Sequence, residues 1–587
     1  MSRRREFIGS LAAAAVCNPS LFARAHVVDE INATRPVIQG ANVAATVHPL
    51  ASLAAVSMYK LGGNAIDAAA AAALCLGVVD GHNSGIGGGC LILVHLADGT
   101  CHAIDGRETA PRLAHKNMYL RSGVADVQLS QDGPLACGVP GQIAALKSVH
   151  SRFGALPWQD LFEPAIRAAH DGIAMSSAVA LSIKNEEQVL RNFKSSTDVL
   201  FKAGGMPYST GDHWVQRDLS RTLENIAKHG EGWFYQGEFA DRCSRHIQEH
   251  GGVLDAYDFR NYQAKDRQVL QTEYRGHRVL GFPPPSSGGL HILQMLQILG
   301  RFSMKQVSES GRTTRFYHIL AEAMKLAFAD RAYYLGDSDF VDVPEFLSSQ
   351  EYTNDLAKKI DLTKATNVAG HLPSQGATLD DEKKHTTHLS TADRHGNWVA
   401  LTATVNTSWG NKMIVPGFGV MLNNEMDDFS VSPGVPNAFG LIGSEANSVE
   451  PGKRPLSSMS PSIVLDSKWE PILACGAAGG PRIINATLQT IVRCLDYGMN
   501  IGDAIRESRI HHQWQPNSLY CESSLGDAYN PNLLNDALVD QLRDLGHNVK
   551  VSGSLAVAQG VQRVKGTGII EAACDPRSGG RAAMMES

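Results

Sequence analysis

The chain has 587 residues, of which 43% are hydrophobic and 19% are charged, and its formal net charge at pH 7 is −6. This composition is typical of a soluble globular protein with a large hydrophobic core. The net negative charge, together with the lack of a Lys/Arg cluster beyond the first few residues, argues against a nucleic-acid-binding protein.

The N-terminus has the pattern of an export signal. Arg3–Arg5 gives a positively charged start with a twin-arginine character, the apolar run Gly9–Val16 follows, and Ala23–Ala25 has the small residues of a cleavage site. We therefore expect residues 1–25 to be removed, so that a periplasmic or secreted protein starts near His26. A disordered basic N-terminus is the alternative interpretation.

Cysteine usage bears on disulfides and on metals. The chain contains ten cysteines, and loss of Cys17 with the signal would leave nine, none of which forms a Cys-x-x-Cys pair. This pattern argues against a disulfide framework and against a zinc ribbon, although one or two bridges stay open. We expect neither a metal ion nor another cofactor.

The start of the mature chain predicts two successive helices. His48–Leu61 has the pattern of a helix that ends at Gly62-Gly63, and a second helix starts at Asn64. Asp67 lies in its first turn, where the helix dipole favours a negative charge. The run Ala65–Val79 is almost wholly apolar but too short to span a membrane, so we expect a helix buried in the core.

The glycine-rich stretch Gly85–Gly89 is followed by a predicted strand, Cys90–His95. A dinucleotide-binding loop has the reverse context, since it follows a strand and opens a helix, so we expect a tight turn here. Leu93–Ile104 then predicts a β-hairpin that turns at Ala97–Gly99 and leads to Arg107, just beyond a strand end.

The central part of the chain is predicted to be mainly helical, with amphipathic stretches throughout residues 140–270. Pro283–Gly289 predicts a rigid turn before a helix over Leu290–Leu299, and Thr314–Leu335 predicts a long amphipathic helix. The segment Leu379–His385 is polar and charged, which is typical of an exposed linker.

The stretch directly after this linker is the most informative part of the chain. Two β-rich runs, residues 387–392 and 398–405, flank a polar turn over Arg394–Asn397 and predict a β-hairpin. A cut between the linker and this strand would leave Thr386 as a new N-terminus. Such a threonine carries its own base, an α-amine with a pKa of about 7.7–8.0. The alternative is an ordinary strand start.

Strands dominate the rest of the chain. They are predicted at residues 419–422, 462–466 and 470–475, and a helix over Asn485–Tyr497 follows Gly479-Gly480. His511-His512 resembles a metal-binding pair. Adjacent residues of an extended segment point to opposite faces, however, so we do not expect these two side chains to bind one ion.

Several motifs in a fixed order carry a resemblance to a known family. Together with Thr386–Ser390, they resemble the γ-glutamyltranspeptidases (glutathione hydrolases), which are self-cleaving N-terminal-nucleophile hydrolases. The likeness extends from about Gln39 to about Arg577. The other motifs are Asp105–Pro111, Pro283–Gly289, Leu422–Ser430, Lys453–Pro461 and Gly476–Gly480.

This resemblance implies an α+β fold, namely a four-layer αββα sandwich of two stacked antiparallel sheets between helices. It also implies self-cleavage into a large chain, residues 26–385, and a small chain, residues 386–587, which share one domain as a heterodimer. The implied reaction cleaves γ-glutamyl amides such as glutathione and passes the γ-glutamyl group to water, amino acids or peptides. No cofactor, nucleic acid or stable membrane anchor is expected.

The resemblance also implies the reacting groups. Thr386 would be the nucleophile and, through its free amine, the general base, and it would form an acyl-enzyme. Thr404 on the partner strand would orient Thr386. The backbone N–H groups of Gly479 and Gly480 would stabilise the oxyanion.

Six further residues are implied in binding the charged head of the γ-glutamyl group. A guanidinium fork and two hydroxyls would bind its α-carboxylate, and two carboxylates with an amide would bind its α-ammonium. The first set is Arg107, Ser457 and Ser458, and the second set is Asp428, Glu425 and Asn406.

The chain departs from the family pattern in places. His385 stands where bacterial relatives often have Asn, and Glu425 replaces the Gln of some bacterial members. Ala477-Ala478 precede the glycines where Ser-Pro is usual. The stretch Pro433–Lys453, with Phe439, matches a substrate-covering lid that some related acylases lack, which favours the transpeptidase branch.

Two other functions stay open. A related N-terminal-threonine amidase, such as a glutaryl-cephalosporin acylase, would keep Thr386 and the glycines but would need no ammonium site. From a different class, the chain could be an uncut periplasmic binding protein for γ-glutamyl compounds, although the Thr386-Thr387 motif argues against it.

Overall fold

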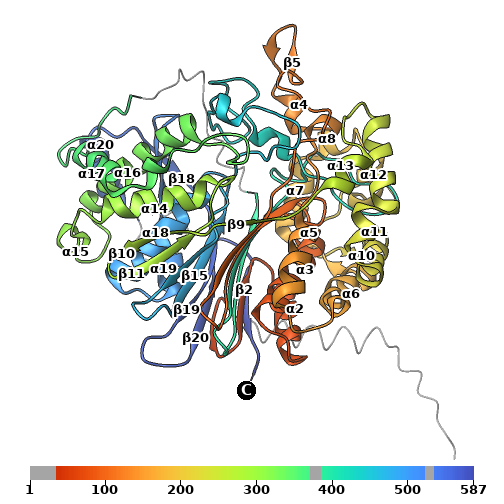
Figure 1. The fold of residues 1–587 in the computed structure, drawn as a ribbon, viewed down its shortest axis with the longest axis horizontal. Helices are drawn as coiled ribbons and strands as arrows, with labels where there is room; N and C mark the ends of the chain where they lie inside the picture. Colours follow the sequence, from red (N-terminus) through yellow and green to blue (C-terminus); the bar gives the residue numbers. More distant parts are fainter. Residues whose placement is uncertain (1–34, 370–384, 523–533, 587) are drawn as a thin grey trace, which may run out of the picture.

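The computed structural model describes residues 35–369, 385–522 and 534–586. Two seven-stranded sheets lie face to face, and helices cover the outer face of each (Figure 1). The fold is therefore the α+β four-layer αββα sandwich that the resemblance predicted. The expected signal, residues 1–25, and the linker up to Lys384 lie outside the described residues.

The first sheet contains the predicted hairpin at its centre. Its strands pair antiparallel, with Thr387 opposite Ala403 and Leu389 opposite Leu401. In spatial order they are β21 (Arg581–Met584), β2 (Val43–Thr46), β12 (Thr387–Ala392), β13 (Trp398–Thr404), β3 (Gly89–His95), β4 (Cys101–Gly106) and β9 (Lys265–Arg267).

The second sheet is also antiparallel throughout. Its order is β1 (Val37–Gly40), β20 (Ile570–Cys574), β19 (Val557–Arg563), β15 (Pro471–Ala478), β14 (Ser462–Leu465), β11 (His277–Gly281) and β10 (Leu270–Tyr274). Each sheet thus combines strands that precede Thr386 with strands that follow it.

The interior between the sheets is apolar. Leu91 and Leu93 of β3 and Trp398 of β13 pack against Ile463 of β14 and Ala474 of β15, and all five are buried. Sheets that stack in this way bury the inward side of every strand, and the removal of that surface from water is the main stabilising contribution.

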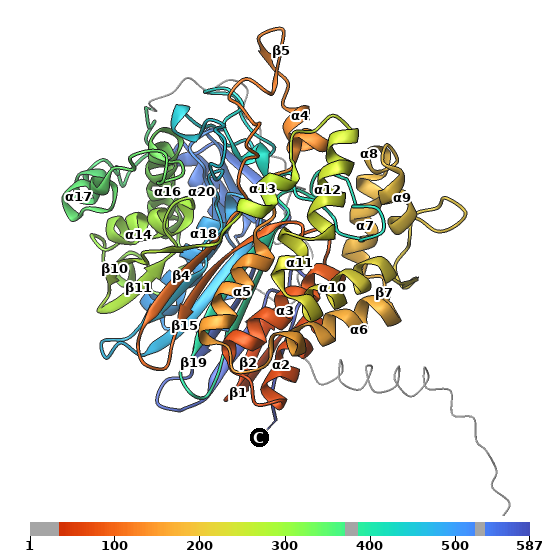
Figure 2. The same cartoon turned by 45° about the vertical axis from the view of Figure 1, so that its right-hand side comes forward.

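The helices over the first sheet include the predicted apolar helix α3 (Ala65–Val79), which packs under the hairpin (Figure 2). Asn64 and Asp67 form a capping box at its start, as the sequence pattern indicated. The same layer contains α2 (Pro49–Lys60), α5 (Gln142–Phe153), α6 (Glu163–Asp171), α10 (Arg217–His229), α11 (Glu231–Tyr235), α12 (Glu238–Glu249) and α13 (Ala256–Asn261).

The helices over the second sheet carry the other half of the core. They are α14 (Ser287–Leu299), α15 (Met304–Val307), α16 (Thr314–Tyr334), α17 (Gln350–Lys358), α18 (Arg482–Tyr497), α19 (Ile501–Arg506) and α20 (Asp536–Asp544). Helix α18 starts three residues before its predicted start at Asn485, so that it follows Gly480 and Pro481 directly.

The strand predicted at residues 419–422 is absent from the structure, and that prediction is wrong. Met421 forms only an isolated bridge with Ile414. The backbone on either side of it bonds to the short segment 411–415, since Leu422 N donates to the Met413 carbonyl and Val415 N donates to the Val420 carbonyl, and this contact is too short to form a strand pair. An apolar run can therefore be buried as a loop between other segments without pairing as a strand.

Cysteine side chains in the described residues form no disulfide, and eight of the nine are buried. Within the same residues, no helix has both the length and the apolar character that crossing a bilayer requires.

Candidate active site

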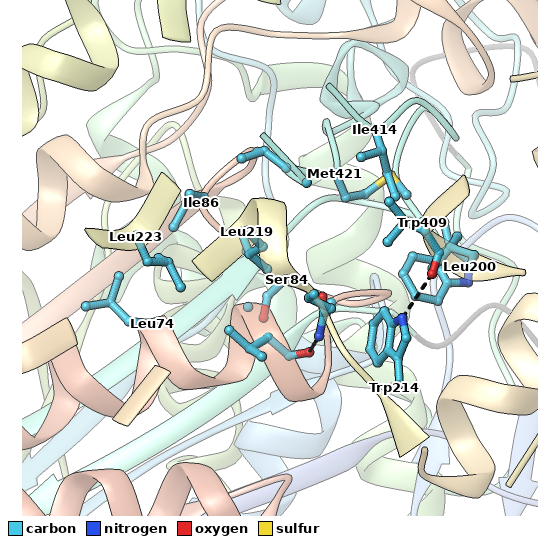
Figure 3. Close-up of a pocket in the computed structure, with 18 residues that line it drawn as sticks. Leu74, Ser84, Ile86, Leu200, Trp214, Leu219, Leu223, Trp409, Ile414 and Met421 are labelled. Carbon is cyan, nitrogen blue, oxygen red and sulfur yellow. Dashed lines mark hydrogen bonds between the residues drawn. The ribbon is translucent and has the colours of Figure 1, made fainter. Parts of the chain in front are cut away.

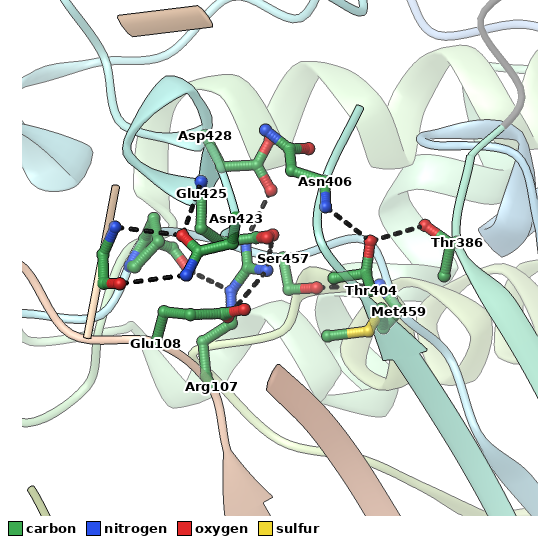
Figure 4. Close-up of polar contacts among 12 residues, drawn as sticks. Arg107, Glu108, Thr386, Thr404, Asn406, Asn423, Glu425, Asp428, Ser457 and Met459 are labelled. Atoms are coloured by element: carbon green, nitrogen blue, oxygen red, sulfur yellow. Dashed lines mark hydrogen bonds and ion pairs between the residues drawn. The ribbon is translucent and has the colours of Figure 1, made fainter. Parts of the chain in front are cut away.

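Thr386 lies directly before β12 and is almost fully buried. Its Oγ1 is 3.1 Å from Oγ1 of Thr404 at the end of β13, and Thr404 Oγ1 accepts a hydrogen bond of 2.8 Å from the backbone N–H of Asn406 (Figure 4). The hairpin register brings the two threonines together, because the start of β12 lies beside the end of its antiparallel partner β13.

The backbone at Thr386 is strained. Its φ angle is 94°, in a region that a β-branched residue rarely adopts. Such conformations typically store about 1–3 kcal/mol and persist only when the surrounding structure enforces them. This φ angle is the rotation about the N–Cα bond of Thr386, so the strained residue directly follows the peptide bond between His385 and Thr386.

Two glycines join β15 to α18 beside this peptide bond. The N–H of Gly479 donates a hydrogen bond of 3.1 Å to the carbonyl oxygen of His385. The φ angles of Gly479 and Gly480 are 135° and 60°, and only glycine adopts the first of these readily. These two residues precede the N-terminus of α18, where the helix dipole favours negative charge.

An aromatic side chain closes over the second glycine. A Cβ atom on Gly480 would lie 2.6 Å from the ring of Phe439, so a larger residue does not fit there. Phe439 belongs to the predicted lid, and its backbone is held by Asn437 Oδ1 at 3.0 Å and by Gln513 Nε2 at 3.3 Å.

Arg107 follows β4 and is fully buried. Its Nη1 contacts Glu425, its Nη2 contacts Asp428, and its Nε donates to the carbonyl of Pro455 at 3.1 Å (Figure 4). The resemblance implied that the arginine binds the α-carboxylate of a substrate and that the two carboxylates bind its α-ammonium. In the structure, the arginine forms direct ion pairs with both carboxylates.

Three carboxyl groups, Glu108, Glu425 and Asp428, lie around the single guanidinium of Arg107. Burial raises the pKa of Glu425 and of Asp428, with Arg107 opposing the shift, and burial raises the pKa of Glu108 to about 7. Glu108 Oε2 is 3.6 Å from Arg107 Nη1. One guanidinium therefore serves three carboxyl groups, and a ligand ammonium group would improve the charge balance.

The two serines lie on a loop held by the proline-rich turn. Ser457 N donates to the Pro285 carbonyl at 2.8 Å, and Ser287 N donates to the Ser457 carbonyl at 2.9 Å. The segment before α14 and the segment after Lys453 therefore pair as a short parallel bridge, which places Ser457 and Ser458 beside Arg107.

Nine of the ten candidate residues line a single pocket with Phe439, and Gly479 lies behind it on the His385 carbonyl. The free space in the pocket is about 20 Å³, which is room for one or two water molecules. This space is too small for an amino-acid-sized ligand unless the surrounding side chains move. The nine residues are Arg107, Thr386, Thr404, Asn406, Glu425, Asp428, Ser457, Ser458 and Gly480.

The sequence analysis assigned no role to three residues that support this pocket. Glu108 and Arg331 lie behind Arg107 and Ser458. Asn423 accepts from the Glu425 N–H at 3.0 Å and donates to the Gly87 and Gly138 carbonyls. Glu108 and Asn423 lie within two of the motifs that carry the resemblance, Asp105–Pro111 and Leu422–Ser430. Arg331, in contrast, lies outside every motif, and the sequence pattern predicts only a polar residue on an amphipathic helix.

A second enclosed cavity, of about 30 Å³, lies between α3 and α10 (Figure 3). Its walls are mainly apolar, including Leu219, Trp409 and Met421, and the buried Ser84 hydroxyl has no partner among the described residues. The described residues that line this cavity include no pair of a nucleophile and a base.

One buried cluster has metal-ligand chemistry. The ligand atoms of His318, Glu322 and His547 lie within 4.8 Å of one another. Lys325 Nζ already contacts Glu322, however, and His318 Nδ1 and His547 Nε2 are 2.7 Å apart in a direct hydrogen bond. An ammonium group thus supplies the cation that balances this carboxylate, and the cluster is explained without a metal.

The sequence matches proteins of known activity over most of its length. The family model described as Gamma-glutamyltranspeptidase matches residues 51–585. The Glutathione hydrolase proenzyme of Escherichia coli (strain K12) is 39% identical over 548 residues, covering 92% of this chain and 91% of that protein.

Solved structures give the same relationship. The cephalosporin acylase from Bacillus halodurans superposes with a TM-score of 0.82 at 27% identity, covering 94% of this chain and 97% of that one. The Helicobacter pylori gamma-glutamyltranspeptidase matches with a TM-score of 0.54 at 37% identity, covering 56% of this chain and 94% of that one. The fold is thus shared by both activities.

Proposed function

The chain belongs to the γ-glutamyltranspeptidase family, and we propose that it matures by a cut between His385 and Thr386 and then uses Thr386 to cleave γ-glutamyl amides. It is an enzyme with γ-glutamyl hydrolase and transferase activity. Glutathione is the substrate proposed first, because several curated relatives are named glutathione hydrolase. Amino acids or peptides are the proposed acceptors.

One observation carries the proposal most strongly. The carbonyl of His385 accepts a hydrogen bond from Gly479 N–H. The next residue, Thr386, has a strained backbone and bears the hydroxyl that would attack this carbonyl. Attack of this hydroxyl on the polarised carbonyl forms an ester and breaks the His385–Thr386 amide bond, with the hydroxyl proton passing to the released amine. Water then hydrolyses the ester.

The same groups would serve turnover. After the cut, the free α-amine of Thr386 takes the proton of its own hydroxyl as that oxygen attacks the δ-carbonyl of the substrate. The N–H groups of Gly479 and Gly480 donate to the developing oxyanion, and loss of one such donor typically costs about 2.7–4 kcal/mol in the barrier. The amine then protonates the leaving group, and water or an acceptor amine releases the acyl group.

The charged head of the substrate would replace the internal ion pairs of the pocket. Its α-carboxylate would accept hydrogen bonds from the guanidinium of Arg107 and from the hydroxyls of Ser457 and Ser458. Its α-ammonium would then neutralise Asp428 and Glu425. Because the carboxyl groups are already buried, this exchange adds a cation where the charge balance requires one.

The two products of the cut would remain associated as one domain. Each sheet mixes strands from both sides of Thr386, so separating the chains would expose both sheet interiors. We also propose export, from the twin-arginine pattern at Arg3–Arg5 and the small residues at Ala23–Ala25.

A cephalosporin-acylase-like amidase is the second candidate, favoured by the TM-score of 0.82. The acidic residues Glu425 and Asp428 support the first candidate, because a glutaryl group offers them no cation. The deciding experiment is to purify the chain and measure hydrolysis of γ-glutamyl anilide. Two bands on a denaturing gel and rapid release of the aniline are expected, and an intact chain that releases no aniline would overturn the proposal.

A further inference from the structure

A second buried guanidinium lies behind the pocket. Arg331, near the end of α16, donates from Nε to Ser287 Oγ at 3.0 Å and from Nη2 to Ser458 Oγ at 3.3 Å. Its side chain is buried, and among the described residues it forms no ion pair with a carboxylate.

The hydroxyl network fixes the direction of these contacts. Ser287 Oγ donates to the Ser457 carbonyl at 2.8 Å, which leaves a lone pair facing Arg331. A serine hydroxyl has one hydrogen and two lone pairs. Since Arg331 donates to one lone pair of Ser458, the hydrogen of Ser458 stays free to donate toward the pocket. A neighbouring cation also makes that hydroxyl a stronger donor.

The charged groups in the pocket also favour a role for Arg331 in binding the α-carboxylate. Glu108, Glu425 and Asp428 all lie on Arg107, so the α-carboxylate of a γ-glutamyl group would compete with three carboxyl groups for one guanidinium. Burial lowers the pKa of Arg331 to about 10, while the nearby Asp428 opposes the shift. Arg331 is therefore still a cation at neutral pH and supplies a second positive charge.

We propose that Arg331 is a positioning residue that determines specificity for the α-carboxylate of the substrate, acting through Ser458. This inference rests on the proposed function of the pocket. In the alternative, purely structural role, Arg331 would only join α16 to the start of α14 through Ser287 and would not affect specificity.

A cycle of substrate and protein changes separates the two roles. The substrates are γ-glutamyl anilide and 4-aminobutanoyl anilide, which lacks the α-carboxylate. Arg331→Met should lower kcat/KM for γ-glutamyl anilide about tenfold to a hundredfold, mainly through KM, because a hydrogen-bonded charge is lost in both ground and transition states. It should change the value for 4-aminobutanoyl anilide little. If turnover of that analogue is too slow, its inhibition constant completes the cycle.

Matched variants control for folding. Arg493 is another buried arginine, which donates to the carbonyls of Ala504 and Ser508, and Arg493→Met should keep the wild-type ratio of the two kcat/KM values. Arg331→Lys should restore part of the loss, since it keeps the charge without the fork. If Arg331→Met does not fold, Ser287→Ala should give a smaller loss of the same selectivity.

Equal losses for both substrates in Arg331→Met, or in Ser287→Ala if that variant must replace it, would overturn the role of Arg331 and leave the proposed function intact. A wild-type chain that does not hydrolyse γ-glutamyl anilide would instead overturn the proposed function itself.

Discussion

The backbone N–H of Gly479 donates a hydrogen bond of 3.1 Å to the carbonyl oxygen of His385. This carbonyl precedes Thr386, so the donor that would stabilise the oxyanion during turnover already polarises the bond proposed for maturation. One structural element would then serve both reactions. The two steps would differ in what else they need, because the proposed turnover also uses the charged pocket around Arg107.

The position of the cut is the first prediction. Wild-type chain should yield a small chain of 202 residues, from Thr386 to Ser587 (587 − 385), whose N-terminal sequence reads Thr-Thr-His-Leu-Ser. Thr386→Ala should give one uncut, inactive chain, because alanine has no hydroxyl to attack the His385 carbonyl. Normal cleavage of that variant would refute the proposed nucleophile, and Thr387→Ala serves as the neighbouring control that keeps the cut.

The second prediction separates maturation from turnover at Gly479. Alanine at this position is strained, because φ is 135° and a Cβ would also lie 3.2 Å from the Leu555 carbonyl oxygen. Gly479→Ala should slow both self-cleavage and anilide hydrolysis, each by about 10²–10³ if the donor is displaced. Mass spectrometry over time follows the first rate and absorbance follows the second. A variant that cleaves normally but fails to hydrolyse would show that the donor serves turnover alone.

The third prediction concerns acid stability and His388, which lies between the sheets. Its Nδ1 is 2.8 Å from Thr402 Oγ1 and its Nε2 is 3.0 Å from Ser390 Oγ. Burial lowers its pKa to about 3, whereas the unfolded chain has a value of about 6.5. As the pH falls from about 6.5 towards about 3, the unfolded state binds more protons than the folded state, so the free energy of unfolding decreases.

The expected size is about 2 kcal/mol of lost stability from this residue between pH 6.5 and pH 5. Denaturant unfolding of wild type and His388→Gln at both pH values measures the difference, and the variant should lose less by that amount. Buried acids such as Asp80, whose pKa burial raises to about 7, act in the opposite direction, and the single-site comparison removes their effect. His115→Gln, at an exposed site, should match wild type, and an equal loss in His388→Gln would contradict the assignment.

Local patterns predicted most of the fold near the site. The hairpin was predictable because its β-rich runs alternate around a polar turn, and the observed strands β12 and β13 agree within one residue. The strand prediction at residues 419–422 was wrong because apolar character alone does not distinguish a paired strand from a loop buried between other segments. No local signal reports which backbone partners such a run finds.

Contacts between distant residues were beyond the sequence patterns. Arg107 pairs with carboxylates 318 and 321 residues away, and Arg331 reaches a hydroxyl 127 residues away. The motif resemblance supplied Arg107, because a motif marks it. Arg331 has no such mark, since a polar residue on an amphipathic helix usually faces water. Only the packing of α16 against the serine loop brings it to the pocket.

The last prediction concerns specificity between the two candidate enzymes. A glutaryl amide is a γ-glutamyl amide without the α-ammonium group, so it would leave Glu425 and Asp428 without their cation in a buried pocket. Sites built around a polar substrate group reject analogues that lack it by about 10⁴–10⁵ at best. We therefore expect γ-glutamyl anilide to have a far higher kcat/KM than glutaryl anilide. Asp428→Ala should lose most γ-glutamyl activity yet cleave itself normally, because the cut needs only Thr386 and its neighbours. Comparable kcat/KM values for the two anilides in the wild type would show that the chain acts as an acylase.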